Sequence, residues 1–575
     1  MVGLRYSIAL MLFTSASSSA WAIDAYLVAG QSNGWRISHL KQGPEEKKGP
    51  KVYYFGMDCV SEPDTAKLVT LTNLHEGTMG YGLAQALVEK SGKDIVFIQY
   101  CRCGASVLNP AVNGWWPGDD PAGGKVFDEG LFGRFQSYLK SARAQVKQEL
   151  NEELEFKGMF WHQGESDAES DKVKFQATVT NLFGRFRGEL GENVPIIAGH
   201  IRELREGSRA INTTLDAIAK QDAKMLTVPL TGLEFAPDRE GRPDVHIALS
   251  GCHELGRRMV RALDTVEVRA SVTAAGGTVE LAASDASTII GLNLYNGNNP
   301  LKGQGGRNAL VTDDWVEKLA GFRTLKKLNL SNCAITNQAM KHVGKFTALE
   351  ELNLTLTAIS DEGLQHLGNL TQLRVLGLAS SQCTGAGFVH LKNLKHLENV
   401  NFHYTPLNDD GLRAISSVGV QGRLWFAHVK FTDEGALSLA KLSGLKSCGI
   451  GSNHPESSGK SVASLVGLPL ENLSLLDNQA TPEGIAHAAT ISTLRVLDVS
   501  HAPKANDESL KQVSQLPRLE EFRIGSSPDI TDAGLLALAS SKSLKKLTLI
   551  RLKNVTEPGL AALRKARPDL TIEVK

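Results

Sequence analysis

Residues 325–330 read LKKLNL, and the same apolar pattern returns as LEELNL at 349–354, LRVLGL at 373–378 and LENVNF at 397–402. The interval is 24 residues each time. With one-residue slips the pattern continues to LKKLTL at 544–549, over about ten units. A period of this length predicts a solenoid, in which each repeat buries its apolar face only against its neighbours.

Between the leucine runs, short phrases recur: ISDEGL from Ile359, LNDDGL from Leu407 and ITDAGL from Ile530. Each supplies a Ser, Asn or Thr as an N-cap, with acidic residues just inside a helix. Each repeat is therefore predicted to be a strand, a turn and a helix. The period is that of leucine-rich repeats, and the phrase resembles the bacterial ones over about residues 286–575. We expect Ile289, Leu292 and Leu294 to form a capping repeat.

The first half of the chain alternates strand-like and helix-like segments instead. The strand-like runs are 25–29, 95–99, 156–161, 195–199 and 225–230. The helix-like stretches are about 82–90, 131–150, 172–190, 211–224 and 250–263. This alternation predicts a three-layer α/β domain with a mostly parallel sheet, whose ligands bind at the carboxyl ends of the strands.

The composition of the chain limits the kinds of partner that we expect it to bind. At 575 residues the chain is too long for one core, and we expect at least two domains. Lys and Arg total 62, as do Asp and Glu, so the formal net charge is zero. Nothing in this balance attracts nucleic acid or an anionic membrane, and no segment approaches the ~20 apolar residues of a membrane-spanning helix.

The N-terminus predicts export. Arg5 precedes an apolar run and small residues that end in Ala20-Trp21-Ala22, which is typical of a signal peptide cleaved after Ala22. We therefore expect a secreted or periplasmic protein. The predicted organisation is a signal peptide at 1–22, a catalytic domain at 23–268, a linker with the start of the repeat cap at 269–285, and repeats at 286–575.

Seven scattered cysteines do not form the framework of a small disulfide-stapled domain. Cys333 and Cys448 stand at positions of the repeats that we expect to be buried. Cys101 and Cys103, two residues apart near a probable strand end, suit neither a zinc pair nor an ordinary short disulfide. We predict no metal site and no cofactor.

Three motifs point to chemistry. Gly30-Gln31-Ser32-Asn33 follows the first strand, FWHQGESD occupies 160–167, and Asp244-Val245-His246 precedes the last helix of this half. A serine on a turn at a strand end can act as a nucleophile close to backbone N–H groups. In this order and spacing the motifs resemble SGNH hydrolases of the sialate O-acetylesterase and acetylxylan esterase kind, over about residues 24–264. The resemblance implies a flavodoxin-like fold.

The resemblance also implies roles for individual residues. Ser32 would be the nucleophile and His246 the general base. An oxyanion hole would form from the backbone N–H groups of Ser32 and Gly104 and the side-chain amide of Gln163. Gly77 and Gly80 also stand in turns before a helix, so either of them is an alternative to Gly104 as the backbone donor.

The acid partner of His246 departs from the family pattern. The family has Asp three residues before the histidine, where this chain has Pro243. Asp244, two residues before, is our candidate, and Asp238 or Glu240 could substitute from the same loop. The acid holds the imidazole tautomer and stabilises the imidazolium, so a displaced acid would weaken a Ser–His pair without abolishing it.

Other polar and aromatic residues have less specific interpretations. Asn33 and Glu165 are predicted to contact the substrate, and Trp115 and Trp116 stand on a Gly/Pro-rich loop where they could stack on a sugar or simply anchor the loop. Glu165 and Asp167 are two apart on one loop, which favours orienting or pinning roles over the carboxylate pair of a glycosidase. The histidines His200 and His253 are interpreted as structural.

The leading interpretation is a secreted carbohydrate O-acetylesterase that acts through an acyl-serine intermediate on an acetylated carbohydrate. The repeats would bind a protein or polysaccharide. A lipase or thioesterase of the same fold is an alternative, although lipolytic relatives more often carry a GDS block in place of GQSN. A non-catalytic adhesion protein with a degenerate esterase domain is another.

Overall fold

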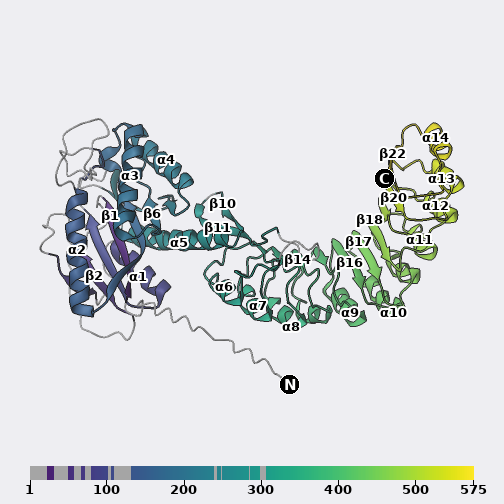
Figure 1. Ribbon diagram of the computed structural model, residues 1–575, viewed down its shortest axis with the longest axis horizontal. Coiled ribbons are helices and arrows are strands. Elements are labelled where there is room, and N and C mark those ends of the chain that lie inside the picture. The colour runs from purple at the N-terminus through teal and green to yellow at the C-terminus, as the bar shows by residue number, and fades with distance from the viewer. Residues whose placement is uncertain are drawn as a thin grey trace, which may run out of the picture. The chain divides into compact units, whose positions relative to one another are not determined.

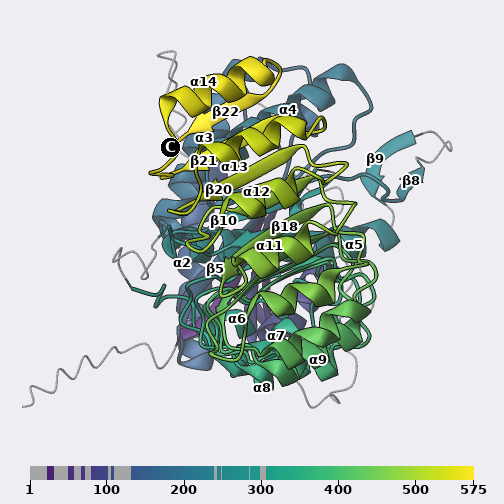
Figure 2. The same ribbon diagram turned by 90° about the vertical axis from the view of Figure 1, so that its right-hand side faces the viewer.

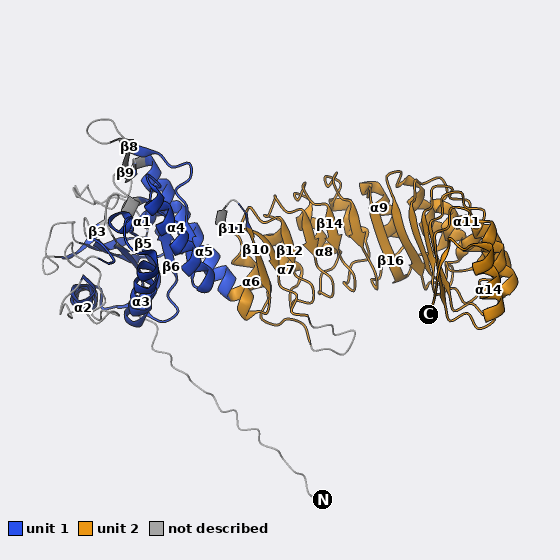
Figure 3. Ribbon diagram, turned by 90° about the horizontal axis from the view of Figure 1, so that it is seen from above, with its two compact units in different colours: residues 1–270, 282–288 blue, residues 271–281, 289–575 orange. Residues whose placement is uncertain are grey.

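The computed structural model describes residues 22–30, 50–56, 66–71, 79–101, 105–108, 131–237, 243–247, 249–283, 285–297 and 306–575. The chain divides into two compact units, residues 1–270 with 282–288 and residues 271–281 with 289–575 (Figure 3). No helix within these described ranges is long and apolar enough to span a bilayer.

The first unit is an α/β fold (Figure 1). Its strands are β1 (Ala22–Gly30), β2 (Val52–Gly56), β3 (Leu68–Leu71), β4 (Ile95–Cys101), β5 (Glu153–His162), β6 (Ile196–Gly199), β7 (Met225–Val228), β8 (Phe235–Pro237) and β9 (Pro243–Ile247). Its helices are α1 (Met79–Ser91), α2 (Leu131–Leu150), α3 (Lys172–Leu190), α4 (Glu206–Gln221) and α5 (Leu249–Ala274).

Within the described residues the sheet order is β3-β2-β4-β1-β5-β6-β7, and β8 pairs separately with β9. Only β3 is antiparallel to its neighbour in the larger sheet. Apart from the β2–β3 pair, the order β4-β1-β5-β6-β7 is flavodoxin-like, with its switch point between β1 and β5. The predicted mostly parallel sheet is therefore confirmed.

Two buried clusters pack the helices onto the two faces of the sheet. Residues of α2, α3 and α4 pack on one face of the sheet, with Phe135, Phe186 and Ile211 among them. Residues of α1 and α5 pack on the other face, where Leu83 and Leu255 are fully buried. The three layers were predicted, because each helix carries apolar residues at helical spacing for one face only.

Some boundaries differ from the prediction. The strands β2, β3, β8 and β9 were not predicted, and α4 begins at Glu206 rather than near Ile211. The helix α5 continues past Leu263 to Ala274, into the stretch interpreted as a linker. The reason for the longer helix is burial, since Val266 follows Leu263 at helical spacing and lies in the same core.

The second unit is a solenoid. Its strands are β10 (Thr278–Ala282), β11 (Asp285–Asn293), β12 (Lys327–Asn329), β13 (Glu351–Asn353), β14 (Val375–Gly377), β15 (Asn399–Asn401), β16 (Arg423–Val429), β17 (Ser447–Ser452), β18 (Asn472–Asp477), β19 (Val496–Val499), β20 (Glu521–Gly525), β21 (Lys546–Ile550) and β22 (Thr571–Val574). Its α-helices are α6 (Asp313–Glu317), α7 (Asn337–Val343), α8 (Asp361–Leu364), α9 (Asp409–Val418), α10 (Asp433–Ala436), α11 (Pro482–Ala488), α12 (Asp507–Val513), α13 (Asp532–Ala537) and α14 (Glu557–Ala566).

The strands β10 to β22 form one sheet in chain order, and Figure 2 shows α11 to α14 stacked in the same order. Lys327 pairs with Glu351 and Glu351 with Val375, which are intervals of 24 residues. Ser447 pairs with Asn472, an interval of 25, which is one of the predicted slips. Cys333 and Cys448 are buried as expected, and burial raises the pKa of each thiol to about 12.

The helix-starting phrases link neighbouring repeats. Asp409 accepts hydrogen bonds from the backbone N of Thr432 at 2.8 Å and from its hydroxyl at 2.7 Å. The same carboxylate bridge joins Asp313 to Thr336, Asp361 to Thr384, Asp433 to Ser458, Asp507 to Thr531 and Asp532 to Thr556. The hydrogen bonds from Thr556 lower the pKa of Asp532.

The predicted N-caps are confirmed in two of the three quoted phrases. Asn408 accepts from the backbone N of Gly411, and Thr531 accepts from that of Ala533. Ser360 makes no capping bond, because its hydroxyl accepts instead from Asn337 of the preceding repeat at 2.8 Å.

In several repeats the carboxylate bridge requires the glycine of the helix-starting phrase, as at Gly435, Gly534 and Gly559. A Cβ at Gly435 would lie 2.0 Å from Oδ1 of Asp409, the oxygen that the next Thr must reach. Gly435→Ala should therefore destabilise the solenoid by about 1–3 kcal/mol, as overpacking does. Calorimetry of the full chain would measure this as a lower transition temperature of the repeat unit.

Gly321→Ala is the matched control, because nothing lies within 4 Å of its added Cβ. Equal transition temperatures for the two variants would contradict this account of the glycine.

Candidate functional site

The switch point of the first unit brings three strand ends together. Gly30 at the end of β1 lies opposite Cys101 of β4 on one side and His162 of β5 on the other. His162 lies in turn opposite Gly199, the last residue of β6. The segments that follow β1, β4 and β5 therefore start from one edge of the sheet, and they carry Ser32, Gly104 and Gln163.

Several predicted site residues lie outside the described residues. These are Ser32, Asn33, Gly104, Trp115, Trp116, Asp238 and Glu240. For Asp244 and His246 the backbone alone is described, and it is extended in β9. The roles expected of these residues stay predictions.

Strand β9 is joined to the core of the first unit at its last residue. It pairs antiparallel with β8, with Phe235 opposite Ile247. Ile247 is buried in the same cluster as Val28 and Phe160, which stand two residues before the ends of β1 and β5. The strand with Asp244 and His246 thus ends in the core on the α1 and α5 face of the sheet.

Gln163 is fully buried directly after β5. Its Nε2 donates to the backbone carbonyl of Ala105 at 3.4 Å, which links it to the segment after Gly104. Its Oε1 has no hydrogen-bond partner among the described residues. A buried uncharged amide at this edge is the kind of group that an oxyanion hole uses.

The turn after Gln163 depends on a glycine. Gly164 has φ 152° and ψ −12°, a backbone conformation that side chains rarely allow. A Cβ there would also meet Cγ2 of Ile211 on α4 at 2.6 Å. This turn directs the following residues, Glu165 to Asp167, back along the edge as a single turn of 3-10 helix.

Asp167 pins the segment that follows β4. Its carboxylate accepts from the hydroxyl of Ser106 at 2.5 Å and from the backbone N atoms of Val107 at 2.8 Å and Leu108 at 3.1 Å. Asp167 itself is fully buried. The loop-pinning interpretation is thereby confirmed for this residue.

Glu165 has a different environment. Its side chain is 10% exposed, its Oε1 lies 3.9 Å from Nδ1 of His162, and its Oε2 has no hydrogen-bond partner among the described residues. An acid with a spare acceptor beside the switch point can bind a hydroxyl group of a ligand. Its predicted contact with substrate stays a prediction.

His162 belongs to this site and was not singled out from the sequence. It is 4% exposed, and within the described part of the chain neither ring nitrogen makes a hydrogen bond. A Cβ at Gly199 would lie 2.8 Å from Cδ2 of His162, so that glycine leaves room for the ring. Buried polar groups without a hydrogen bond are rare and often functional.

His200 is structural, as predicted. Its Nε2 lies 2.9 Å from Oδ1 of Asp216, which also accepts from the Thr227 hydroxyl at 2.5 Å. Burial alone would raise the pKa of Asp216, but these two hydrogen bonds outweigh it and lower the pKa. The pair ties the loop after β6 to α4.

No three His, Cys, Asp or Glu side chains of the described ranges are close enough together to hold a metal ion. Among the described residues at this edge, Gln163, Glu165 and His162 have buried polar atoms without a hydrogen-bond partner.

Comparison with known proteins gives the first unit a family. Residues 22–265 match the family described as carbohydrate esterase, sialic acid-specific acetylesterase. Residues 323–341 and 347–368 match a leucine-rich repeat family. No curated protein matches the chain.

Among solved structures, a carbohydrate acetylesterase from Xanthomonas citri is 15% identical, and the match covers 42% of this chain and 56% of that one, with a TM-score of 0.31. A protein from Arabidopsis thaliana is 15% identical over 42% of this chain and 98% of its own, with a TM-score of 0.30. An internalin from Listeria monocytogenes is 15% identical over 44% of this chain and 82% of its own, with a TM-score of 0.30.

Asp167→Asn should loosen the segment after β4. The amide places an N–H group where an oxygen now accepts a hydrogen bond, and leaving a buried donor unpaired costs about 1–3 kcal/mol. Hydrogen exchange should become faster at the amides of Val107 and Leu108. Glu169→Gln is the control, because Glu169 is an exposed partner of Arg205. Unchanged exchange in Asp167→Asn would contradict the pinning role.

Proposed function

We propose that the protein removes acetyl groups from a carbohydrate, since residues 22–265 form a domain of the sialic acid-specific acetylesterase family of carbohydrate esterases. In detail, we propose a serine esterase with Ser32 as nucleophile and His246 as general base. Export of the mature chain, inferred from residues 1–22, is part of the same proposal.

The register of the parallel strands carries this proposal. Gly30 lies opposite Cys101 and His162, so the segments with Ser32, Gly104 and Gln163 begin side by side. An acyl-transfer site needs a nucleophile and uncharged donors within a few ångströms of one carbonyl group. Three strand ends at a switch point meet this need, because ligands of such sheets bind there.

The reaction would proceed in two steps. The Ser32 hydroxyl would attack the acetyl carbonyl carbon while His246 takes its proton, and collapse of the tetrahedral intermediate would release the sugar hydroxyl, protonated by His246. Water would then attack the acetyl-serine with His246 again as base. This second attack releases acetate and restores Ser32.

The oxyanion would be stabilised by uncharged donors. The described geometry supports Gln163, which is buried and is held beside Ala105 by its hydrogen bond. Asp167 supports the same arrangement indirectly, since it fixes the backbone of Ser106 to Leu108 next to Gly104. Loss of one oxyanion donor typically lowers turnover by about 10²–10³.

Ser32→Ala and His246→Ala should each remove nearly all release of acetate from an acetylated glycan. The double variant should be scarcely worse, because the two groups act as one unit. His200→Ala is a control at the same sheet edge and should keep its turnover per folded molecule. Turnover that survives in Ser32→Ala would exclude the acyl-serine route, and a wild-type chain without esterase activity would favour a non-catalytic adhesion protein.

Asp244→Asn tests the third member of the proposed triad. If Asp244 orients His246, the amide presents the wrong tautomer to the imidazole, and turnover should fall by a large factor; the analogous change in a serine protease costs about 10⁴. Asp238→Asn and Glu240→Gln should be nearly silent. A large loss in either of these two, with Asp244→Asn active, would move the acid to that position.

A further inference from the structure

The concave side of the repeat sheet contains a groove of about 740 Å³. It crosses β10 to β16 and is formed by residues of the second unit alone. Adjacent strands lie about 4.8 Å apart, so these seven strands span about 29 Å. The groove can therefore hold a chain molecule that runs across the strands.

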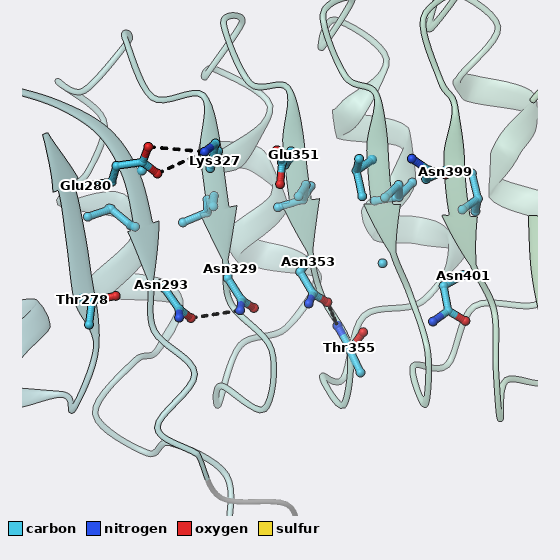
Figure 4. A pocket seen from close by; sticks show the side chains of 18 of the residues that line it. Thr278, Glu280, Asn293, Lys327, Asn329, Glu351, Asn353, Thr355, Asn399 and Asn401 are labelled. Carbon is cyan, nitrogen blue, oxygen red and sulfur yellow. Dashed lines mark hydrogen bonds and ion pairs between the residues drawn. The ribbon is translucent and has the colours of Figure 1, made fainter. Parts of the chain in front are cut away.

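A row of asparagines forms the floor of the groove (Figure 4). Asn293, Asn329, Asn353 and Asn401 stand at one register position of β11, β12, β13 and β15, and Gly377 holds that position in β14. The Oδ1 atoms of Asn353 and Asn401 accept from backbone N atoms two residues on, at 3.0 and 2.9 Å. Their Nδ2 groups make no hydrogen bond to another described residue and can donate to a ligand.

An indole ring continues the row. Trp425 of β16 lies opposite Asn401, at the same register position. A Cβ at Gly449 of β17 would lie 2.5 to 2.7 Å from three atoms of the indole, so the ring lies flat over that glycine. The exposed guanidinium of Arg423 lies over the ring, 4.6 Å from its centre, so a sugar that stacks on the indole displaces this side chain.

A second aromatic pair, Tyr404 and His428, stands three residues after Asn401 and Trp425, beyond the residues that line the groove. The ring of Tyr404 stacks on that of His428, with centres 4.4 Å apart and planes at 14°. Nδ1 of His428 is fixed 2.9 Å from Asp477. Tyr404 is 52% exposed, and its positive φ of 55° recurs at the equivalent position of other repeats, as in Asn332, Leu356 and Ser380.

The charges of the groove cancel. Its charged lining residues are Glu280, Lys327, Glu351 and Arg423, two acids and two bases. Glu280 and Lys327 form an ion pair at 3.2 Å. An acidic or basic ligand gains nothing from such a lining, whereas amides suit uncharged hydroxyl groups, which both donate and accept.

The far end of the same sheet has a different character. On β19 to β22, Arg523 lies 3.6 Å from Asp498, and Lys546 lies 2.8 Å from Glu573. These charged groups are paired with one another, so the amide-rich, aromatic part of the concave face is confined to the first strands of the sheet.

We propose that this groove binds a neutral polysaccharide chain, whose sugar faces stack on Trp425 and Tyr404 and whose hydroxyl groups accept hydrogen bonds from the asparagine row. Flat aromatic rings bind the apolar faces of sugar rings, and fixed amides read their hydroxyl groups. A role in bringing an acetylated chain to the esterase domain rests on the proposed function, but the binding itself does not.

Titration calorimetry of the full-length protein tests the groove, with soluble acetylated xylan, the same xylan after deacetylation, and polygalacturonate as an acidic comparison. Wild type should bind both xylans, and polygalacturonate at least ten-fold more weakly. Trp425→Ala should weaken xylan binding about ten-fold, and Trp425→Phe should restore most of it. Asn353→Ala and Tyr404→Ala should each weaken binding about three-fold or more. Val389→Ala, an exposed apolar residue outside the groove, is the matched control and should bind as wild type.

Absence of binding to either xylan by the wild type, or equal binding by Trp425→Ala and Val389→Ala, would overturn this inference. Preference for polygalacturonate would do the same, as would binding of a protein partner that needs Trp425 while the xylans fail. Release of acetate from a small soluble ester is measured separately. Its loss together with intact xylan binding would count against the proposed function and leave the groove in place.

Discussion

Parallel pairing of strands is the constraint on which both halves of this protein depend. Two parallel neighbours cannot be joined by a tight hairpin, so the chain must return over one face of the sheet after every strand. In the first unit the returns use both faces, and the order reverses between β1 and β5. In the second unit the order never reverses, because each strand is added to the same growing edge. The first arrangement leaves a crevice at strand ends and the second leaves an open sheet face.

The repeats were predictable because every copy must bury apolar side chains at the same positions. Leu328 and Leu330 must be buried in every copy, and the spacing of such pairs predicted even the one-residue slips that the strand register contains. The alternation of the first half likewise predicted its parallel core. The strands β2 and β3 were missed because they pair antiparallel with each other, with no helix between them to mark the change of period. The β8–β9 pair was missed for the same reason.

The sequence predicted the candidate site only where the residues that act together are close in the chain. Gln163 and Asp167 belong to one phrase after a strand; the resemblance to the esterase family implied the role of Gln163, and the loop position of Asp167 favoured an orienting or pinning role. The sequence could not separate Glu165 from Asp167, since both are acids on the same turn. Their difference comes from residues distant in the chain: Ser106, Val107 and Leu108 supply three donors to Asp167. His162 was missed because its cavity depends on Gly199 of another strand. A glycine at a strand end was the only signal of it.

The solenoid also separates stability from recognition within each repeat. The leucines and the carboxylate bridges between helix starts fix how one repeat stacks on the next, and these positions tolerate little change, as the 2.0 Å approach at Gly435 shows. The two concave positions of each strand, such as Lys327 and Asn329, lie outside the buried leucines, although Asn329 still donates to Asn293 of the preceding strand at 2.9 Å. The residue type at these positions can change without loss of the fold, so the side chains there can be selected for binding a ligand. The four asparagines at one such position each accept a backbone N–H two residues on, so their side-chain oxygens serve the fold. The amide N–H groups of Asn353 and Asn401 take no part in that bond, and binding explains them better than folding does.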